Sequence, residues 1–353
     1  MPSRFVSSVA FRWEGSVNYH HCRALARALL AIVVFWSFVS GRVAAQEGRE
    51  DQKPVPRTRE GKPNFQGVWL SNTATPLERP DSLASRDRLT DEEVATLRER
   101  ATKIFRNGRS AFTTPEGAFF AALNDVETYE GQSTSSSIGM VELEFTNRTA
   151  LILDPPTGRI PSLTRQAIER EESVDSGWRS KRGPEDLNNI HRCITTGVPR
   201  LGGNFGAGPY TFYQIVQTPT DFAFVSEAFH DARLIPLDGK PRLTGRIRQW
   251  NGDSRGHWEE DTLVVESRNF SRNSYFRGSA EGLQLVERFT LSSEDTLIYQ
   301  MTLTDPTTWA SSWTAEIPLK RQQDPVYEFA CHEGNHSIVG MLRTARLEDS
   351  RSR

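Results

Sequence analysis

Residues 283–304 read LQLVERFTLSSEDTLIYQMTLT, and this stretch decides the fold class. Apolar and polar residues alternate with a period of two in both halves, which is the pattern of strands with one buried face. In the second half the apolar face consists of Leu297, Tyr299, Met301 and Leu303. The short connection between the halves favours an antiparallel hairpin over a parallel crossover.

Glu287 interrupts the apolar face of the first of these strands, since its neighbours two positions away, Leu285 and Phe289, are apolar. A carboxylate on such a face is rarely buried without a partner. We therefore expect Glu287 to be buried and paired with an Arg or Lys. A protonated, acidic Glu287 is the alternative.

The same period extends outward from this hairpin over most of residues 140–330. Further candidate strands are 140–145, 149–153, 210–217, 222–227, 232–237, 247–250, 256–259, 262–268, 312–318 and 326–330. The sequence therefore predicts a mostly-β protein. The first expectation is an antiparallel, lipocalin-like barrel with insertions, and the second is a curved two-sheet sandwich.

Two peripheral helices are expected, near residues 91–105 and 337–347, with a shorter one around 119–124. Thr90 and Glu93 form a capping box at the start of the first helix. Ile338, Met341, Leu342 and Ala345 give the last helix its spacing of three and four.

The N-terminal 45 residues have the pattern of a signal peptide, with a basic region, an apolar core at 28–40 and small residues before Gln46. We expect export to the periplasm or secretion, with no stable membrane insertion after cleavage. An uncleaved anchor is the alternative. Residues 46–63 then form a flexible leader, and residues 64–350 form one mostly-β domain with a helical and loop insertion at 89–137.

The formal net charge of −2 gives the chain no global field that would attract nucleic acid. After signal cleavage two cysteines remain, Cys193 and Cys331. In an oxidising compartment an even pair of cysteines is most simply a disulfide, and two unpaired thiols are the alternative.

A first cluster of reactive groups lies at residues 227–233, which read EAFHDAR. Glu227, His230 and Asp231 provide a histidine beside carboxylates, the minimum for acid–base catalysis or metal binding. The alternative is a turn in which Asp231 caps local amides and pairs with Arg233.

A second cluster, residues 331–336, reads CHEGNH and matches H-E-x-x-H. Gly334 and Asn335 disfavour the helix that a zinc protease needs there. We expect instead a non-helical loop that supplies His332 and Glu333 to a site, or a plain surface loop fixed by Cys331. His230 and His332 are the candidate ligands of one divalent metal ion.

Aromatic and basic residues in the middle of the chain are candidates for ligand binding, namely Arg233, Arg248, Trp250 and Trp258. The first functional hypothesis is binding of a small, aromatic or apolar molecule in a polar-rimmed cavity. The second is an enzyme in the same cavity, of hydrolase, lyase or isomerase type, with metal-assisted or plain acid–base chemistry. The third is a structural envelope protein without a pocket.

Several blocks resemble those of a family of exported bacterial proteins of unknown function. The blocks are residues 149–161, 192–194, 230–269, 305–309 and 331–335. The resemblance covers most of the mature chain and implies no activity. Gly67-Val68-Trp69 is similar to the G-x-W that opens lipocalin-like barrels, in which the Trp closes the barrel floor, often under an Arg from a late strand.

Overall fold

The computed structural model describes residues 54–106, 115–126, 143–171, 181, 183–195, 197–199, 212–274 and 276–351. The chain divides into two units, Met1–Gln52 and Lys53–Arg353, and every described residue belongs to the second. The signal peptide predicted for residues 1–45 therefore lies outside the described residues. Within the described ranges, no helix combines the length and apolar character needed to cross a membrane.

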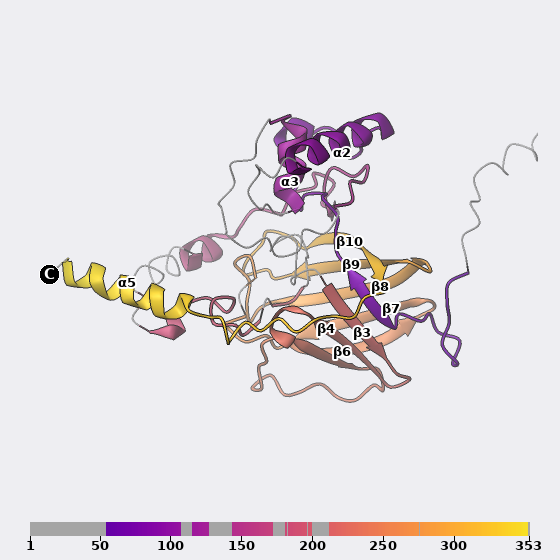
Figure 1. Cartoon of the computed structure of the whole chain (residues 1–353). Coiled ribbons are helices and arrows are strands. Elements are labelled where there is room, and N and C mark those ends of the chain that lie inside the picture. The colour runs from indigo at the N-terminus through magenta and orange to yellow at the C-terminus, as the bar shows by residue number, and fades with distance from the viewer. Residues whose placement is uncertain are drawn as a thin grey trace, which may run out of the picture. The chain divides into compact units, whose positions relative to one another are not determined.

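Among the described residues, ten strands make up most of the regular structure, which confirms the mostly-β prediction (Figure 1). They are β1 (Gly67–Leu70), β2 (Ile152–Asp154), β3 (Phe212–Gln217), β4 (Asp221–Ser226), β5 (Ala232–Pro236), β6 (Asp253–Glu259), β7 (Thr262–Arg268), β8 (Gln284–Ser293), β9 (Thr296–Thr304) and β10 (Trp313–Gln322). The helices are α2 (Asp91–Arg106), α3 (Pro115–Leu123) and α5 (Ser337–Arg351), with 3-10 turns η1 (Asp81–Leu83), η2 (Pro184–Asp186) and η4 (Ala228–His230). Residues 165–171 are also helical.

All strand pairs are antiparallel, and the order across the sheet is β5-β4-β3-β1-β10-β9-β8-β7-β6, with β2 paired to β10. The expected hairpin is present as β8 and β9, with Phe289 opposite Tyr299. The two edge strands, β5 and β6, do not pair with each other, so the sheet is not closed. The closed barrel that was the first expectation is therefore wrong, and the single open sheet fits a curved sheet or the two-sheet sandwich of the second expectation.

The sheet curves enough for its two halves to share one aromatic core. The ring of Phe224 on β4 lies 5.8 Å from that of Phe289 on β8 and 6.1 Å from that of Tyr299 on β9. Phe289 and Tyr299 stack at 4.8 Å, and Tyr213 on β3 packs on Phe224 at 5.0 Å. These rings are almost completely buried, so side chains fill the concave face of the sheet.

The edge strands β5 and β6 approach each other through side chains instead of a backbone ladder. Gly256 on β6 faces β5 so closely that a Cβ there would lie 2.5 Å from Leu237 Cδ2. Arg233 on β5 donates from Nε to Ser254 Oγ on β6 at 3.0 Å and reaches Ser267 on β7 at 3.3 Å.

Glu287 is fully buried on β8 and forms an ion pair with Arg233, which confirms the expectation for this residue. Arg233 Nη1 donates to Glu287 Oε1 at 2.9 Å, and the hydroxyl of Tyr299 donates to the same oxygen at 2.6 Å. Burial alone would lower the pKa of Arg233, but the charge of Glu287 and its hydrogen bond, with smaller contributions from Tyr299 and Asp231, together outweigh burial, and the pKa is raised. The pair joins β5 to the opposite half of the sheet.

Trp69 on β1 is fully buried, and the guanidinium of Arg321 on β10 lies 4.2 Å from its ring centroid. A Cβ at Gly67 would lie 2.8 Å from Arg321 Nη1, and Gly67 has a φ of +133°. Glycine is thus required for the close approach of β1 to this arginine. The Arg–Trp contact that the G-x-W similarity implies is present, although the barrel is not closed.

The helical part of the domain has a second apolar core. Helices α2 and α3 lie side by side (Figure 1) and bury Leu97, Ala101, Phe119 and Ala122 together with Phe145. The predicted capping box is present, since Thr90 N donates to Glu93 Oε2 at 2.7 Å and Glu93 N donates to Thr90 Oγ1 at 3.2 Å. Arg148 connects this part to the sheet through Glu316 on β10, at 3.0 Å.

Two segments expected as strands are irregular. Residues 247–250 form an exposed connection, in which only Gln249 makes an isolated bridge, to Phe270. Residues 326–330 pair with no strand and instead pack through Phe329 against Phe229, with ring centroids 5.8 Å apart. A third, 140–145, lies partly outside the described residues and contains only an isolated bridge at Glu144. A segment with alternating apolar and polar residues forms a strand only where another strand is available to pair with it.

Candidate functional site

Four segments meet at one end of the sheet, where β4 ends and where β5 and β6 begin. The predicted disulfide is present and joins two of them, with the Cα atoms of Cys193 and Cys331 5.8 Å apart. Phe229, Phe329 and Ile190 pack around it. We call the four segments, residues 188–195, 227–231, 249–251 and 327–335, the disulfide site.

Two residues beside the disulfide have left-handed backbone conformations, Cys193 with a φ of +54° and Phe229 with a φ of +62°. Such conformations cost about 1–3 kcal/mol for residues other than glycine and persist only where the surroundings hold them. They cluster at functional sites more often than elsewhere. Here the disulfide constrains Cys193, and Phe229 packs on Phe329.

Asp231 connects three of the four segments. Its carboxylate accepts a hydrogen bond from the hydroxyl of Thr195 and another from Asn251 Nδ2 at 2.6 Å. Its backbone carbonyl accepts from Ser226 N at the end of β4, at 3.0 Å. The side chain predicted as catalytic is thus held firmly by two donors, which suits a group that positions others.

Glu227 is half-buried at the start of the η4 turn. Burial raises the pKa of its carboxyl group, and a hydrogen bond from the backbone N–H of Tyr327 lowers it by less. A carboxyl group with a raised pKa in a partly desolvated place is suited to proton transfer or to ligand binding. The segments 227–231 and 327–335 therefore meet where Glu227 lies beside Tyr327 and Phe229 packs on Phe329.

His191 and Asn335 also belong to the disulfide site, although sequence reasoning did not select them. Asn335 Nδ2 donates to the carbonyl of His191 at 2.7 Å and to Cys193 Sγ at 3.2 Å. Burial and the charge of Lys181 lower the pKa of the His191 imidazole, so the ring is neutral at neutral pH. The position of His191 two residues before Cys193 was the available signal.

His332 and Glu333 are exposed on a turn, and α5 begins only at Ser337. The H-E-x-x-H stretch is therefore not helical, as its Gly and Asn residues indicated. The side chain of His230 lies outside what the structure describes. Among the described residues no group of three or more His, Cys, Asp or Glu is arranged to hold a metal ion, and the shared metal site of His230 and His332 stays a prediction.

The four residues predicted to bind ligand lie in different surroundings. Arg233 is inside the sheet with Glu287, and Trp258 stacks on Phe65 at 5.6 Å with Lys62 Nζ 5.4 Å from its ring. Arg248 donates to the carbonyls of Phe270 and Glu281, and the Trp250 carbonyl accepts from the hydroxyl of Ser274. Of the four, Trp250 is the residue that lies within the disulfide site.

Comparison of the chain with protein-family models found no match, and a search of curated proteins found no relative. The functional assignment therefore depends on the geometry of the site.

Proposed function

We propose that this is an exported protein that binds a small aromatic or apolar molecule at the disulfide site. The observation that supports this most is the convergence of Phe229, Phe329 and Ile190 beside the half-buried carboxyl group of Glu227, on segments fixed by a disulfide. Apolar side chains with a few fixed polar groups are typical of small-molecule sites. Covalent fixing of two of the segments lowers the entropic cost of holding that geometry.

The concave face of the sheet is less suitable for a ligand, because buried aromatic rings and the Arg233–Glu287 pair already occupy it. We therefore place the ligand at the end of the sheet instead of inside it. Asp231, held by Thr195 and Asn251, supplies the fixed polar rim that we expect around such a molecule.

The neutral dye N-phenyl-1-naphthylamine tests this proposal, because it is aromatic, uncharged and fluorescent when bound. We expect one saturable site on the purified protein. Phe329→Ala should weaken binding about tenfold or more, since it removes an aromatic contact worth about 1.5–3 kcal/mol. The matched control is Phe120→Ala on α3, which should leave binding unchanged.

Absence of saturable binding, or equal binding by the Phe329→Ala variant, would contradict the proposal. Either result would favour the structural envelope role, with which the filled concave face of the sheet agrees.

An acid–base enzyme at the same place is the second candidate, because burial raises the pKa of Glu227 and lowers that of His191. Two titratable groups whose surroundings shift their pKa values are a signature of catalytic sites. A screen with chromogenic esters and glycosides tests it. Activity that is lost in Glu227→Gln while dye binding is retained would support catalysis, and full activity in that variant would exclude Glu227 from it.

A further inference from the structure

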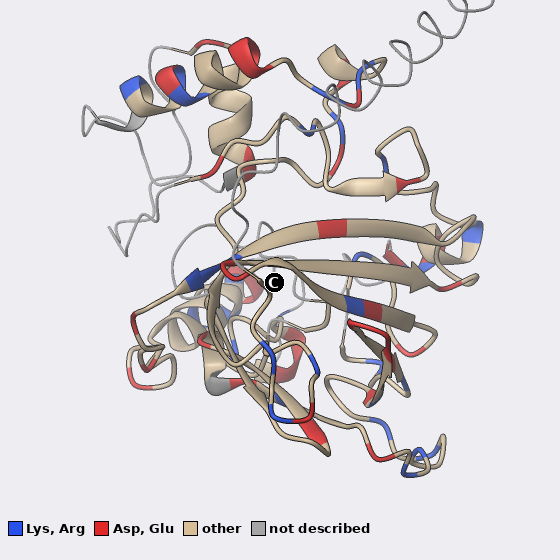
Figure 2. Ribbon diagram, turned by 90° about the vertical axis from the view of Figure 1, so that its right-hand side faces the viewer, with Lys and Arg blue, Asp and Glu red and all other residues tan. Residues whose placement is uncertain are grey.

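The connection between β5 and β6 contains a strongly basic segment. Residues 239–250 include Lys240, Arg242, Arg246 and Arg248 and no Asp or Glu, although the whole chain has a net charge of −2. We call residues 239–250 the basic loop. Figure 2 shows that charged residues concentrate in helices and connections, whereas the strands are mostly uncharged.

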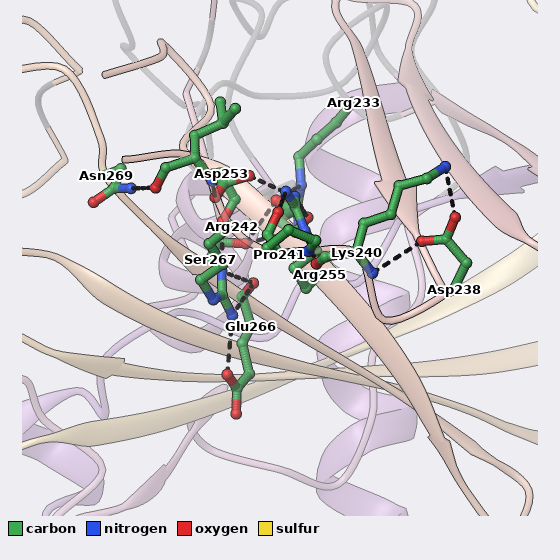
Figure 3. Close-up of polar contacts among 12 residues, drawn as sticks. Arg233, Asp238, Lys240, Pro241, Arg242, Asp253, Arg255, Glu266, Ser267 and Asn269 are labelled. Carbon is green, nitrogen blue, oxygen red and sulfur yellow. Dashed lines mark hydrogen bonds and ion pairs between the residues drawn. The ribbon is translucent and has the colours of Figure 1, made fainter. Parts of the chain in front are cut away.

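The basic loop is held in one conformation by strands β6 and β7 (Figure 3). Arg255 donates to the carbonyls of Lys240 at 3.0 Å and Pro241 at 2.7 Å, and Arg242 Nη1 donates to the carbonyl of Asp253 at 2.8 Å. Further along, Leu243 N donates to Asp253 Oδ2 at 2.8 Å. The loop therefore presents its exposed side chains on a pre-organised backbone.

The four basic side chains of the basic loop have three carboxylates near them, so an excess of positive charge remains. Arg248 donates to two backbone carbonyls, and its Nε lies 4.0 Å from Glu281 Oε2, a carboxylate that it shares with Arg272. Arg246 forms no hydrogen bond or ion pair with the described residues and is exposed. Lys240 and Arg242 have closer carboxylate partners, Asp238 at 2.6 Å and Glu266 at 3.0 Å.

The apex of the basic loop combines this charge with exposed aliphatic side chains. Ile247 N donates to the carbonyl of Thr244 at 2.9 Å, which closes a turn flanked by Leu243 and Ile247. Leu243 is 36% exposed and Ile247 is 51% exposed. Aliphatic tips placed among basic residues match the interface of an anionic lipid bilayer, where apolar groups enter the headgroup region and cations meet phosphates.

We propose that the basic loop is a peripheral docking site for an anionic lipid surface. The aliphatic and basic side chains lie on the exposed apex of a fixed turn, and a lipid surface can adapt to such an apex without a matching recess. This role is independent of ligand binding at the disulfide site. It involves reversible adsorption through one loop and no insertion of a spanning segment.

Vesicle sedimentation tests the proposal, with the exported protein and vesicles of equal parts phosphatidylglycerol and phosphatidylcholine. Removal of residues 1–45 is first verified by intact mass, because the apolar stretch at 28–40 would bind lipid itself. We expect binding to the mixed vesicles but not to pure phosphatidylcholine. Raising the ionic strength to about 1 M should abolish it, since the screening length falls to about 3 Å.

Variants of the basic loop give the sharper test. Each basic residue near such a surface contributes roughly a fivefold factor in affinity, so Arg246→Glu should weaken binding roughly 25-fold. Ile247→Ser should weaken it about fivefold, because the variant loses the apolar contact. The matched controls are Lys103→Glu on α2 and Leu234→Ser on β5, both exposed, and neither should change binding.

Equal binding by Arg246→Glu and the unaltered protein would overturn the proposal, and so would absence of binding to the mixed vesicles at low salt. A dimer in sedimentation velocity that Arg246→Glu dissociates would also overturn it, because a second copy of the chain would then occupy the loop.

Discussion

Replacing Glu287 with alanine tests how the sheet is held together across its open side. Glu287 is fully buried, and its partner Arg233 is only 5% exposed. The variant would leave the Arg233 guanidinium buried beside the hydroxyls of Ser254 and Ser267 without its carboxylate, and it would take away the acceptor of the Tyr299 hydroxyl. Breaking a buried pair in this way typically costs about 3–5 kcal/mol.

That loss is a large fraction of the total stability of a domain, which is about 5–15 kcal/mol. For a domain of this size it corresponds to a fall in Tm on the order of 10 °C. Urea unfolding followed by tryptophan fluorescence, with the disulfide intact, measures the change directly. The m value should stay constant, since the same surface is exposed on unfolding.

A double variant separates the cost of an orphaned charge from the worth of the pair. Arg233→Met with Glu287→Leu removes both charges, and Ser254 and Ser267 remain bonded to each other at 2.8 Å. We expect the double variant to be considerably more stable than Glu287→Ala. A fall of less than about 1 kcal/mol in the free energy of unfolding of Glu287→Ala would refute the reasoning, because burying an unpaired guanidinium costs more free energy than that.

Four further predictions concern single features of the fold. Replacing Cys193 and Cys331 with serine should cost about 4–5 kcal/mol in urea, because the disulfide closes a loop of 138 residues; equal stability of the two forms would contradict this. Gly67→Ala should cost about 1–3 kcal/mol, since its φ is +133° and a Cβ has no room there, and an unchanged Tm would refute it. A hydrogen bond from Arg86 lowers the pKa of Glu93 from 4.5 to about 2, so the Glu93 carboxylate stabilises the fold above pH 4.5 and this stabilisation is lost as the pH falls through 2. Glu93→Gln should remove that part of the acid dependence of unfolding. Burial raises the pKa of Glu227 above 4.5, so its ionisation destabilises the fold as the pH rises; Glu227→Gln should raise Tm at neutral pH and leave it unchanged at pH 4, and an equal effect at both would contradict this.

Parts of the disulfide site could be predicted because each depended on one residue type in one local context. The parity of cysteines after the predicted signal cleavage was enough to pair Cys193 with Cys331, and the mixture of His and carboxylates marked residues 227–233. Asn335 and Thr195 were missed, because their roles depend on partners 142 and 36 residues away. A polar side chain has no sequence signal for a partner that distant.

The sequence by itself determined the mostly-β class, the β8–β9 hairpin, the capped helix α2 and the burial of Glu287. Each follows from side-chain periodicity or from a cap within a few residues, and both act over one element. Tertiary structure alone decided that β5 and β6 meet without a ladder, that Arg233 is the partner of Glu287, and that residues 326–330 form no strand. The path and twist of the whole sheet set these outcomes, because they bring together residues whose separation along the chain leaves no local pattern.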